Sequence, residues 1–354
     1  MPTTYDKVVK FDSKKAANDI TYTSSTLGAE PSFVHYDAAF DAVLVDRPQL
    51  ELLEERSEKF AHEAGVYIKS NNTEWFTSNY QSGRSIEIYS IDCATQNIQQ
   101  QPLSCIPNAN GACNHNDKVL WCAQGSLTSP SALIATDPQT HESTTLLDNF
   151  HGRQFNSIND VVVHHPTGDI WFTDPIYGYE QAFRPPPQLP SQVYRFRPST
   201  GQVWCVADGF NECNGLCFSP DYGRMYVTDT GAMKAHGTPG TGTNFSLNPR
   251  NPASVYEFDV VDGGARLTGR RMFAYCDVGI PDGIKCDELG NVYSGCGDGV
   301  HVWDPLGTLI GKIRTNTVVG NFNFAKDGMY IFGEERLFFC RLGTKGALWE
   351  VECA

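Results

Sequence analysis

The sequence predicts an all-β protein, folded as a six-bladed β-propeller with a central metal site. One unit recurs six times along the 354 residues: an Asn, Asp or Glu, a short apolar strand, a turn rich in Asp, Gly and Pro, and a second strand with an aromatic residue. Each copy is followed by a further strand-like run, and successive copies begin between 39 and 68 residues apart. Four short strands in a repeat of this length are typical of propeller blades, which stack to bury both faces.

The six copies of the unit follow one another without a second domain. In the copy that starts at Asn159, residues 161–163 form the first apolar run, 165–169 the turn and 170–173 the second strand. The other copies begin at Glu63, Asn110, Asn214, Asp282 and Asn321.

The ends of the chain are expected to close the ring. We expect the apolar residues 40–45 to supply a strand to the last blade. Residues 1–36 show no clear period, and we expect an N-terminal extension that wraps the outside or is mobile. The predicted organisation is therefore this extension, 1–36, and a single propeller domain, 37–354.

The composition excludes several classes of partner. The formal net charge of −14 repels phosphate backbones and anionic lipid surfaces, so neither a nucleic acid nor a membrane is an expected partner. No basic stretch followed by an apolar run opens the chain, and no apolar segment reaches the length of a membrane span, which together predict a cytoplasmic protein. The twelve cysteines are scattered without a C-x-x-C pair, and we interpret them as buried thiols.

The residues that open the repeats predict the metal site. The first strand of each propeller blade lines the central channel, so the residues that open these strands meet at one mouth. Asn-Gly and Asp-Gly are also common turn formers, and any one of these residues taken alone is more often a turn residue. Their repetition at one structural position favours a shared role. Glu63, Asn159, Asn214 and Asp282 offer two carboxylates and two carboxamides, the oxygen ligands that a hard divalent cation prefers.

Several longer motifs resemble a known family. FNSINDVVV at 155–163, WFTDP at 171–175, NGLCFSPD at 214–221, YVTD at 226–229 and IPDGI at 280–284 resemble the SMP-30/gluconolactonase/lactonohydrolase family, and its fungal lactonohydrolase-like branch in particular. The resemblance covers roughly residues 60–350. It implies a six-bladed propeller with a divalent metal held by a Glu, one or two Asn and an Asp. These map to Glu63, Asn159, Asn214 and Asp282, although Glu63-Ala-Gly departs from the commoner Glu-Gly-Pro.

The resemblance also implies a reaction, the hydrolysis of a lactone. The cation, most readily Ca²⁺ with Zn²⁺, Mg²⁺ or Mn²⁺ as alternatives, would act as a Lewis acid on the lactone carbonyl. Asp282 is the candidate general base. Asn110 is expected to bind the substrate, and Asp229 to orient a ligand from behind.

Two insertions are predicted to choose the substrate. Residues 177–190 and 231–252 connect the second and third strands of their blades, and strand alternation returns them to the mouth that carries the metal site. Tyr177, Tyr179 and Phe183 are expected to form an apolar wall there, with Tyr177 in contact with the substrate.

Two other functions remain open at this level. A calcium-dependent phosphotriesterase-like hydrolase uses the same scaffold, and a non-catalytic calcium-binding propeller would carry the same ligands. The expected partner is a small-molecule lactone, and aldonolactones, pantoyl lactone and aromatic lactones are all compatible with the sequence.

Overall fold

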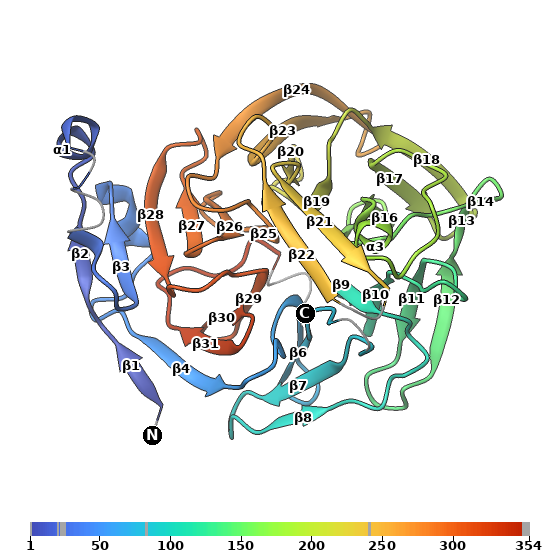
Figure 1. Ribbon diagram of the computed structural model, residues 1–354, viewed down its shortest axis with the longest axis horizontal. Coiled ribbons are helices and arrows are strands. Elements are labelled where there is room, and N and C mark those ends of the chain that lie inside the picture. The colour runs from blue at the N-terminus through green and yellow to red at the C-terminus, as the bar shows by residue number, and fades with distance from the viewer. Residues whose placement is uncertain (1, 20, 22–25, 82–83, 240–241, 349–354) are drawn as a thin grey trace.

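Six sheets stand around a central channel in the computed structural model, which describes residues 2–19, 21, 26–81, 84–239 and 242–348 (Figure 1). The predicted six-bladed propeller is confirmed. Blades 1 to 4 each contain four strands, named from the channel outward. Blade 1 contains β5 Glu63–Ile68, β6 Thr73–Thr77, β7 Ile88–Asp92 and β8 Ile98–Gln100, and blade 2 contains β9 Ala109–His115, β10 Lys118–Ala123, β11 Ala132–Thr136 and β12 Ser143–Leu147. Blade 3 contains β15 Val161–His164, β16 Asp169–Asp174, β17 Gln192–Arg197 and β18 Gln202–Ala207, and blade 4 contains β19 Cys213–Phe218, β20 Arg224–Asp229, β23 Ser254–Val261 and β24 Arg266–Tyr275.

The last two blades are extended by strands from the N-terminal part of the chain. Blade 5 contains β25 Ile284–Cys286, β26 Val292–Cys296, β27 Gly299–Trp303 and β28 Leu309–Arg314, and β3 Ser32–His35 and β2 Val8–Lys10 lie outside β28. Blade 6 contains β29 Asn321–Ala325, β30 Gly328–Gly333, β31 Arg336–Cys340, then β4 Leu50–Glu55 and β1 Thr3–Tyr5. The described part of the N-terminal extension therefore lines the outer edges of two blades.

The strand that closes the ring is not the one predicted from residues 40–45. β4 is the fourth strand of blade 6, where its Leu52 pairs with Phe338 of β31. Phe40 lies instead in the 3₁₀ helix η1, Ala38–Ala42, which begins where the Asp37 carboxylate accepts a hydrogen bond from the Ala39 amide. Phe40 is fully buried against Gly311, where a Cβ atom would lie 2.3 Å from the ring, so this aromatic residue packs against β28 rather than joining a sheet.

The hydrophobic core is divided among the six interfaces between neighbouring blades. Trp75 of blade 1 and Trp121 of blade 2 share one cluster, and Trp171 of blade 3 and Phe218 of blade 4 share another. Strands near the channel, such as β5, β16 and β19, are buried along their whole length because both of their faces meet another blade, whereas outer strands such as β12 are largely exposed. This explains why the inner strands read as continuous apolar runs.

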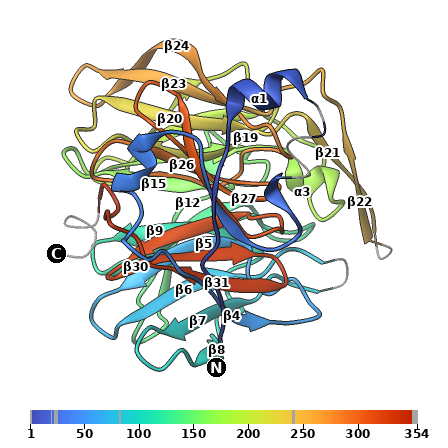
Figure 2. The ribbon, with the colours of Figure 1, turned by 90° about the vertical axis from the view of Figure 1, so that its left-hand side faces the viewer.

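Two short segments project from the ring on one face. The hairpin of β21 Met233–Thr238 and β22 Gly242–Leu247 crosses the middle of the ring in Figure 1, and helix α3, Tyr177–Glu180, lies beside it. The side view places both on the same face (Figure 2). A two-stranded ribbon of β13 Asn149–Phe150 and β14 Arg153–Gln154 follows blade 2.

The described helices are short. Besides η1 and α3 there is α1, Ser13–Asn18, which carries no buried residue. None of the helices in the described ranges has the length and apolar character needed to cross a membrane.

Most of the cysteines lie inside the blades. Eight of the eleven described cysteines are buried, Cys93 is half-buried, and Cys105 and Cys205 are exposed. The buried ones lie on strands or directly beside them, where a thiol packs as a small apolar side chain.

Candidate active site

A cavity of about 390 Å³ opens at the channel mouth beneath the β21–β22 hairpin. Every blade contributes a side chain to its lining. The six are Glu63, Asn110, Asn159, Asn214, Asp282 and Glu334. Four of them are the predicted metal ligands, which the fold brings together from blades 1, 3, 4 and 5.

The four predicted ligands occupy equivalent positions at or just before the inner strands. Glu63 opens β5 and Asn214 lies at the second position of β19, while Asn159 and Asp282 precede β15 and β25 by two residues. All four are buried, with exposed fractions between 1% and 8%. The repeat therefore places one oxygen-bearing side chain per blade at the same height in the channel.

The glycines that follow Asn110 and Asn214 allow neighbouring blades to pack closely and do not form turns. A Cβ atom at Gly111 would lie 2.5 Å from the Asn159 backbone oxygen, and one at Gly215 would lie 2.6 Å from the Asp282 backbone oxygen. Real side chains do not tolerate such contacts with backbone. The Asn-Gly pairs of blades 2 and 4 therefore let the ligand-bearing backbone of the next blade approach closely, which the interpretation as turn residues did not anticipate.

Threonine hydroxyls on the second strands connect two of the predicted ligands, Asn214 and Asp282, to the preceding blade. Thr228 accepts a hydrogen bond from the Gly215 amide (2.8 Å) and donates to the Asp282 backbone oxygen (3.0 Å). Thr173 donates in the same way to the Asn214 backbone oxygen (2.6 Å). Sequence reasoning assigned these residues no role, although the recurrent Trp-Phe-Thr and Tyr-Val-Thr endings carried the signal.

Removing the Thr228 hydroxyl is expected to weaken metal binding, because this hydroxyl holds the backbone of the predicted ligand Asp282. Thr228→Val keeps the shape of the side chain but removes both hydrogen bonds. We expect calcium affinity to fall by about 10–100-fold, since partners of ligands commonly have effects of this size. Isothermal titration with calcium measures it.

Thr136→Val is the matched control for this test. Thr136 is equally buried, but its hydroxyl contacts only Ser143 in blade 2. Both variants are expected to lose about 1–3 kcal/mol of stability. Equal calcium affinities in the two variants would show that the contact of Thr228 with Asp282 does not position the site.

Three of the four predicted ligands present an unsatisfied oxygen. Asn159 Oδ1, Asn214 Oδ1 and Asp282 Oδ1 are buried and find no hydrogen-bond partner among the described residues. The orientation of the Asn214 amide is fixed because its Nδ2 donates to the Tyr177 hydroxyl (3.2 Å), which also contacts Thr230. Buried oxygens normally have a partner, and three orphans in one cavity match the donor set of a hard cation.

Burial and neighbouring negative charges oppose the ionisation of both carboxylates of this group. Burial raises the pKa of the Glu63 carboxyl to about 8, and the negative charge of Asp282 adds to the effect. Burial likewise raises the pKa of Asp282 to about 8, together with the charge of Glu334. Ligand atoms of His62, Glu63 and Asp282 all lie within 4.8 Å of one another. A divalent cation among them would favour both charged forms.

An ion pair beside Glu63 was not predicted from the sequence. His62 Nδ1 lies 2.9 Å from Glu334 Oε1, and Lys59 and Asn79 also contact the Glu334 carboxylate. Burial raises the pKa of the Glu334 carboxyl, but His62, Lys59 and Asn79 together outweigh burial and the pKa falls to about 2. His62 belongs to blade 1 and Glu334 to blade 6, so no local sequence motif indicates the pair.

The remaining predicted site residues fall into two groups. Asn110 and Tyr177 line the cavity, and Asn110 Nδ2 donates to the Asn159 backbone oxygen (3.2 Å). Asp229 does not line it. Its carboxylate accepts hydrogen bonds from the amides of Asn211 and Glu212 (both 3.0 Å), and so fixes the segment that leads into β19 and Asn214.

Both insertions rim the cavity, as predicted. Tyr177, Glu180 and Gln181 line it from the first insertion. The second insertion contains the β21–β22 hairpin, which contributes Met233, Ala235, Phe245 and Leu247. Of the expected aromatic wall, Tyr177 faces the cavity, whereas Phe183 packs against Tyr80 and Tyr179 is half exposed.

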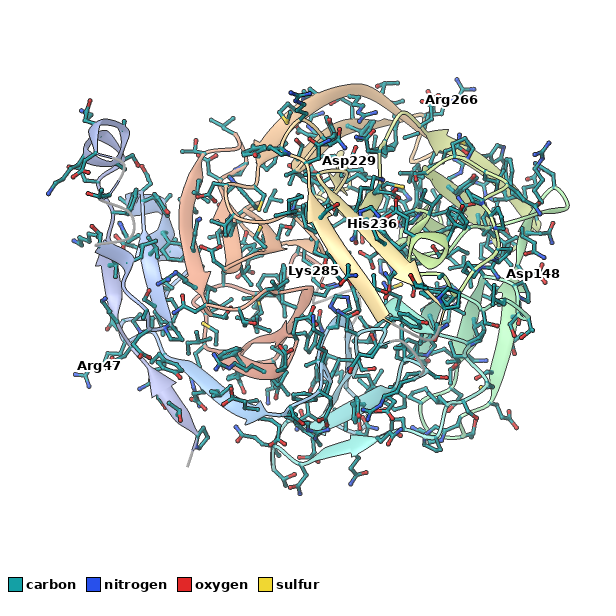
Figure 3. All side chains as sticks on the ribbon, viewed as in Figure 1. Arg47, Asp148, Asp229, His236, Arg266 and Lys285 are labelled. Carbon is teal, nitrogen blue, oxygen red and sulfur yellow. The ribbon has the colours of Figure 1, made fainter. Side chains whose placement is uncertain are left out.

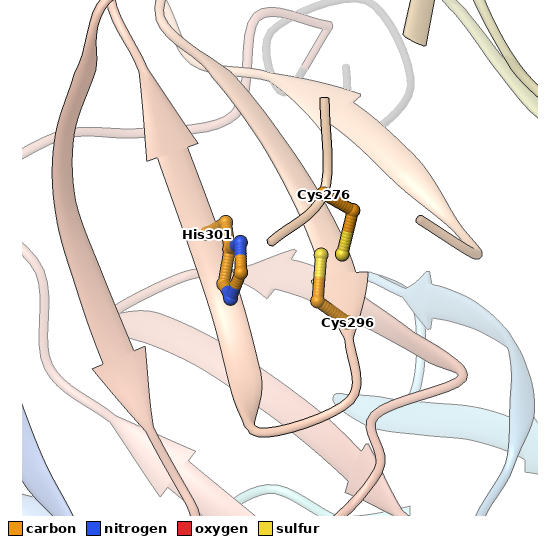
Figure 4. A group of neighbouring side chains, drawn as sticks. All are labelled: Cys276, Cys296 and His301. Atoms are coloured by element: carbon orange, nitrogen blue, oxygen red, sulfur yellow. The ribbon is translucent and has the colours of Figure 1, made fainter. Parts of the chain in front are cut away.

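A second group of metal-type ligands lies away from the cavity, in and beside blade 5. Cys276, Cys296 and His301 are all buried, and the two sulfur atoms face each other beside the imidazole ring (Figure 4). His301 Nε2 lies 2.6 Å from Asp298 Oδ1, and Nδ1 lies 3.5 Å from Asp277 Oδ1. Carboxylates thus face both ring nitrogens, and we assign no ion to this group.

Comparisons with known proteins show which family this chain resembles in sequence and in fold. Residues 63–333 match the SMP-30/gluconolactonase/LRE-like region. A lactonohydrolase, oryL, of Aspergillus oryzae is 30% identical, covering 92% of this chain and 80% of that protein. A gluconolactonase of Zymomonas mobilis is 27% identical over 68% of this chain and 64% of its own length.

Solved structures share the fold. A gluconolactonase from Xanthomonas campestris matches with a TM-score of 0.70 and 27% identity, over 87% of this chain and 94% of that one. Regucalcin, a calcium-binding protein from Agrobacterium tumefaciens, matches with a TM-score of 0.59 and 16% identity, over 84% and 94%. The family region spans all six predicted blade openings. The chain therefore belongs to the SMP-30/gluconolactonase/LRE-like family.

Proposed function

We propose that this chain is a metal-dependent lactonase. The observation that carries the proposal is the set of unsatisfied buried oxygens on Asn159, Asn214 and Asp282, which meet the Glu63 carboxylate in one cavity. Relatives named lactonohydrolase and gluconolactonase support the reaction, and the name of the regucalcin neighbour supports calcium. All four residues offer oxygen, which favours Ca²⁺ over metals that prefer nitrogen or sulfur.

Each residue of the site has a distinct proposed task. When bound, the cation would polarise the lactone carbonyl and stabilise negative charge on its oxygen. Asp282 accepts the proton of the attacking water while the water oxygen bonds to the carbonyl carbon. It then returns that proton to the ring oxygen as the ring C–O bond breaks, which yields the hydroxy acid.

The other cavity residues hold this arrangement in place. Tyr177 fixes the Asn214 amide so that Oδ1, rather than Nδ2, is free in the cavity. Asn110 lies where its amide can contact the substrate, while its Nδ2 bonds to the Asn159 backbone. The proposed partner is a small lactone. We retain the cytoplasm as the proposed compartment.

Removal of the metal is expected to abolish lactone hydrolysis. The substrate panel comprises D-glucono-δ-lactone, pantoyl lactone, an aromatic lactone and a paraoxon-type phosphotriester. Hydrolysis of the lactones is measured by the release of acid, and cleavage of the phosphotriester by the release of a phenol. We expect at least one lactone to be hydrolysed, and exhaustive chelation to lower the rate by at least about 100-fold. Added Ca²⁺ should restore the activity.

The panel separates the alternatives. Full activity after exhaustive chelation would overturn metal dependence. Faster cleavage of the phosphotriester than of any lactone would identify a phosphotriesterase-like enzyme instead. Tight calcium binding without hydrolysis of any substrate would identify a calcium-binding propeller that is not an enzyme.

A further inference from the structure

The cavity has a polar side and an apolar side. The predicted ligands lie at the channel, where the inner strands begin. The opposite wall is apolar, and its residues come from the β21–β22 hairpin and from loops of three blades. They are Tyr80, Met233, Phe245, Leu247, Ile280 and Val318. A ligand that reaches the polar side therefore extends along an apolar surface.

The hairpin turns one apolar face toward this cavity. Met233 pairs with Leu247 and Ala235 pairs with Phe245 across the two strands, so these four side chains share one face. They all line the cavity. Strand alternation puts Lys234 on the other face, together with His236, which is labelled on the hairpin in Figure 3. Phe245 and Leu247 remain 53% and 66% exposed, so their apolar surface is uncovered.

The hairpin is held in this position by charged contacts. Lys234 Nζ lies 2.6 Å from Glu212 Oε1 and 3.1 Å from Glu180 Oε1. The Ala235 amide also donates to Glu180 Oε2 (3.2 Å). Because Glu212 is buried at the foot of α3, the hairpin is anchored over the cavity mouth.

Apart from the predicted ligands Glu63 and Asp282, the charged side chains that line the mouth are already paired. Lys59, His62 and Asn79 all contact Glu334, and Glu180 is occupied by Lys234. A sugar lactone carries several hydroxyl groups that need partners once they leave water. The apolar wall offers them none, whereas it would shield an alkyl or aryl group from water.

We propose that the substrate is a lactone with an apolar substituent, which packs against Met233, Phe245 and Leu247 while the ring lies among the polar side chains. This inference rests on the proposed lactonase function and adds the substrate class. The continuity of the apolar wall with the ligand-lined cavity is what assigns the wall to a substrate rather than to a partner protein.

A homologous series of lactones tests the proposal on the calcium-loaded protein. The series consists of δ-lactones with linear alkyl substituents of increasing length on the carbon that bears the ring oxygen, compared with D-glucono-δ-lactone. We expect kcat/KM to rise about two- to fourfold per methylene until the wall is covered. The longest members should exceed D-glucono-δ-lactone by at least about 10-fold.

Variants locate the effect on the hairpin. The double variant Phe245→Ala, Leu247→Ala should flatten the dependence on chain length. Leu306→Ala removes an equally apolar side chain that is 90% exposed and does not line the cavity, and it should keep the wild-type slope. Thermal unfolding of each variant verifies that it is folded.

The outcomes separate this inference from the function on which it rests. Metal-dependent lactone hydrolysis with no dependence on chain length, or with D-glucono-δ-lactone as the best substrate, would overturn the inference and leave the lactonase standing. An unchanged slope in the double variant would also overturn it. Failure to hydrolyse every lactone would overturn the proposed function itself.

Discussion

Asp282→Asn is expected to lower turnover by about 10²–10⁴-fold even when the metal site is saturated, because the variant cannot accept a proton from water. The asparagine keeps an oxygen of nearly the same shape in a cavity where Asp282 Oδ1 has no hydrogen-bond partner within the described part of the chain. If calcium occupancy is measured on the same samples, loss of the metal can be excluded as the cause of the lower turnover. Calcium content and lactone turnover must therefore be determined together.

Glu63→Gln is the matched control for this experiment. It removes one negative charge from the same group of ligands, with equal burial, but from a residue to which we assign no proton transfer. Both variants should bind calcium more weakly. If fully loaded Asp282→Asn turns over as fast as fully loaded Glu63→Gln, Asp282 is a ligand only, and another group must accept the proton.

The stability of the metal-free protein is expected to fall as pH rises from about 5 to 8. The folded-state pKa values of Glu63 and Asp282 are both raised to about 8, above their ordinary values of 4.5 and 3.8. Between these limits the folded state binds more protons than the unfolded state, so each group contributes stability at low pH that is lost as pH rises. The slope is up to about 1.4 kcal/mol per pH unit for each proton.

Calcium should cancel this loss, since a bound cation keeps both carboxylates charged in the folded state. The measurement is urea unfolding at several pH values, once with chelator and once with saturating calcium. The difference between the two curves isolates the site, because other groups titrate in both. Glu63→Gln should reduce the slope of that difference. Equal stabilisation by calcium at pH 5 and pH 8 would contradict the prediction.

The repeat made the blades, and the meeting of the candidate ligands in one cavity, predictable from the sequence. A blade must bury both faces, so its inner strands are continuous apolar runs between turns, and that pattern is local. The ligands repeat at one position of that pattern, which is why Asn159, Asn214 and Asp282 were identified together. Tyr177 was also placed correctly at the cavity, because its insertion follows a recognisable strand.

Other features depend on contacts that no local pattern encodes. Residues 40–45 are more apolar than β4, yet Phe40 fills the space above Gly311, and β4, with its three glutamates, serves as an outer strand. The pair of His62 and Glu334 joins the first and last blades. Its partners are far apart in sequence and neighbours only once the ring has closed.

The closure of blade 6 by β4 also has a consequence for how the chain is made. β4, Leu50–Glu55, pairs with β31, Arg336–Cys340, so about 280 residues separate the two halves of the closing sheet. At translation rates of about 5–20 residues per second, β4 leaves the ribosome on the order of 15 to 60 seconds before its partner. During that interval its backbone donors and acceptors are open to other chains. Its glutamates, Glu51, Glu54 and Glu55, place negative charges on that edge, which protects the nascent chain from premature strand pairing.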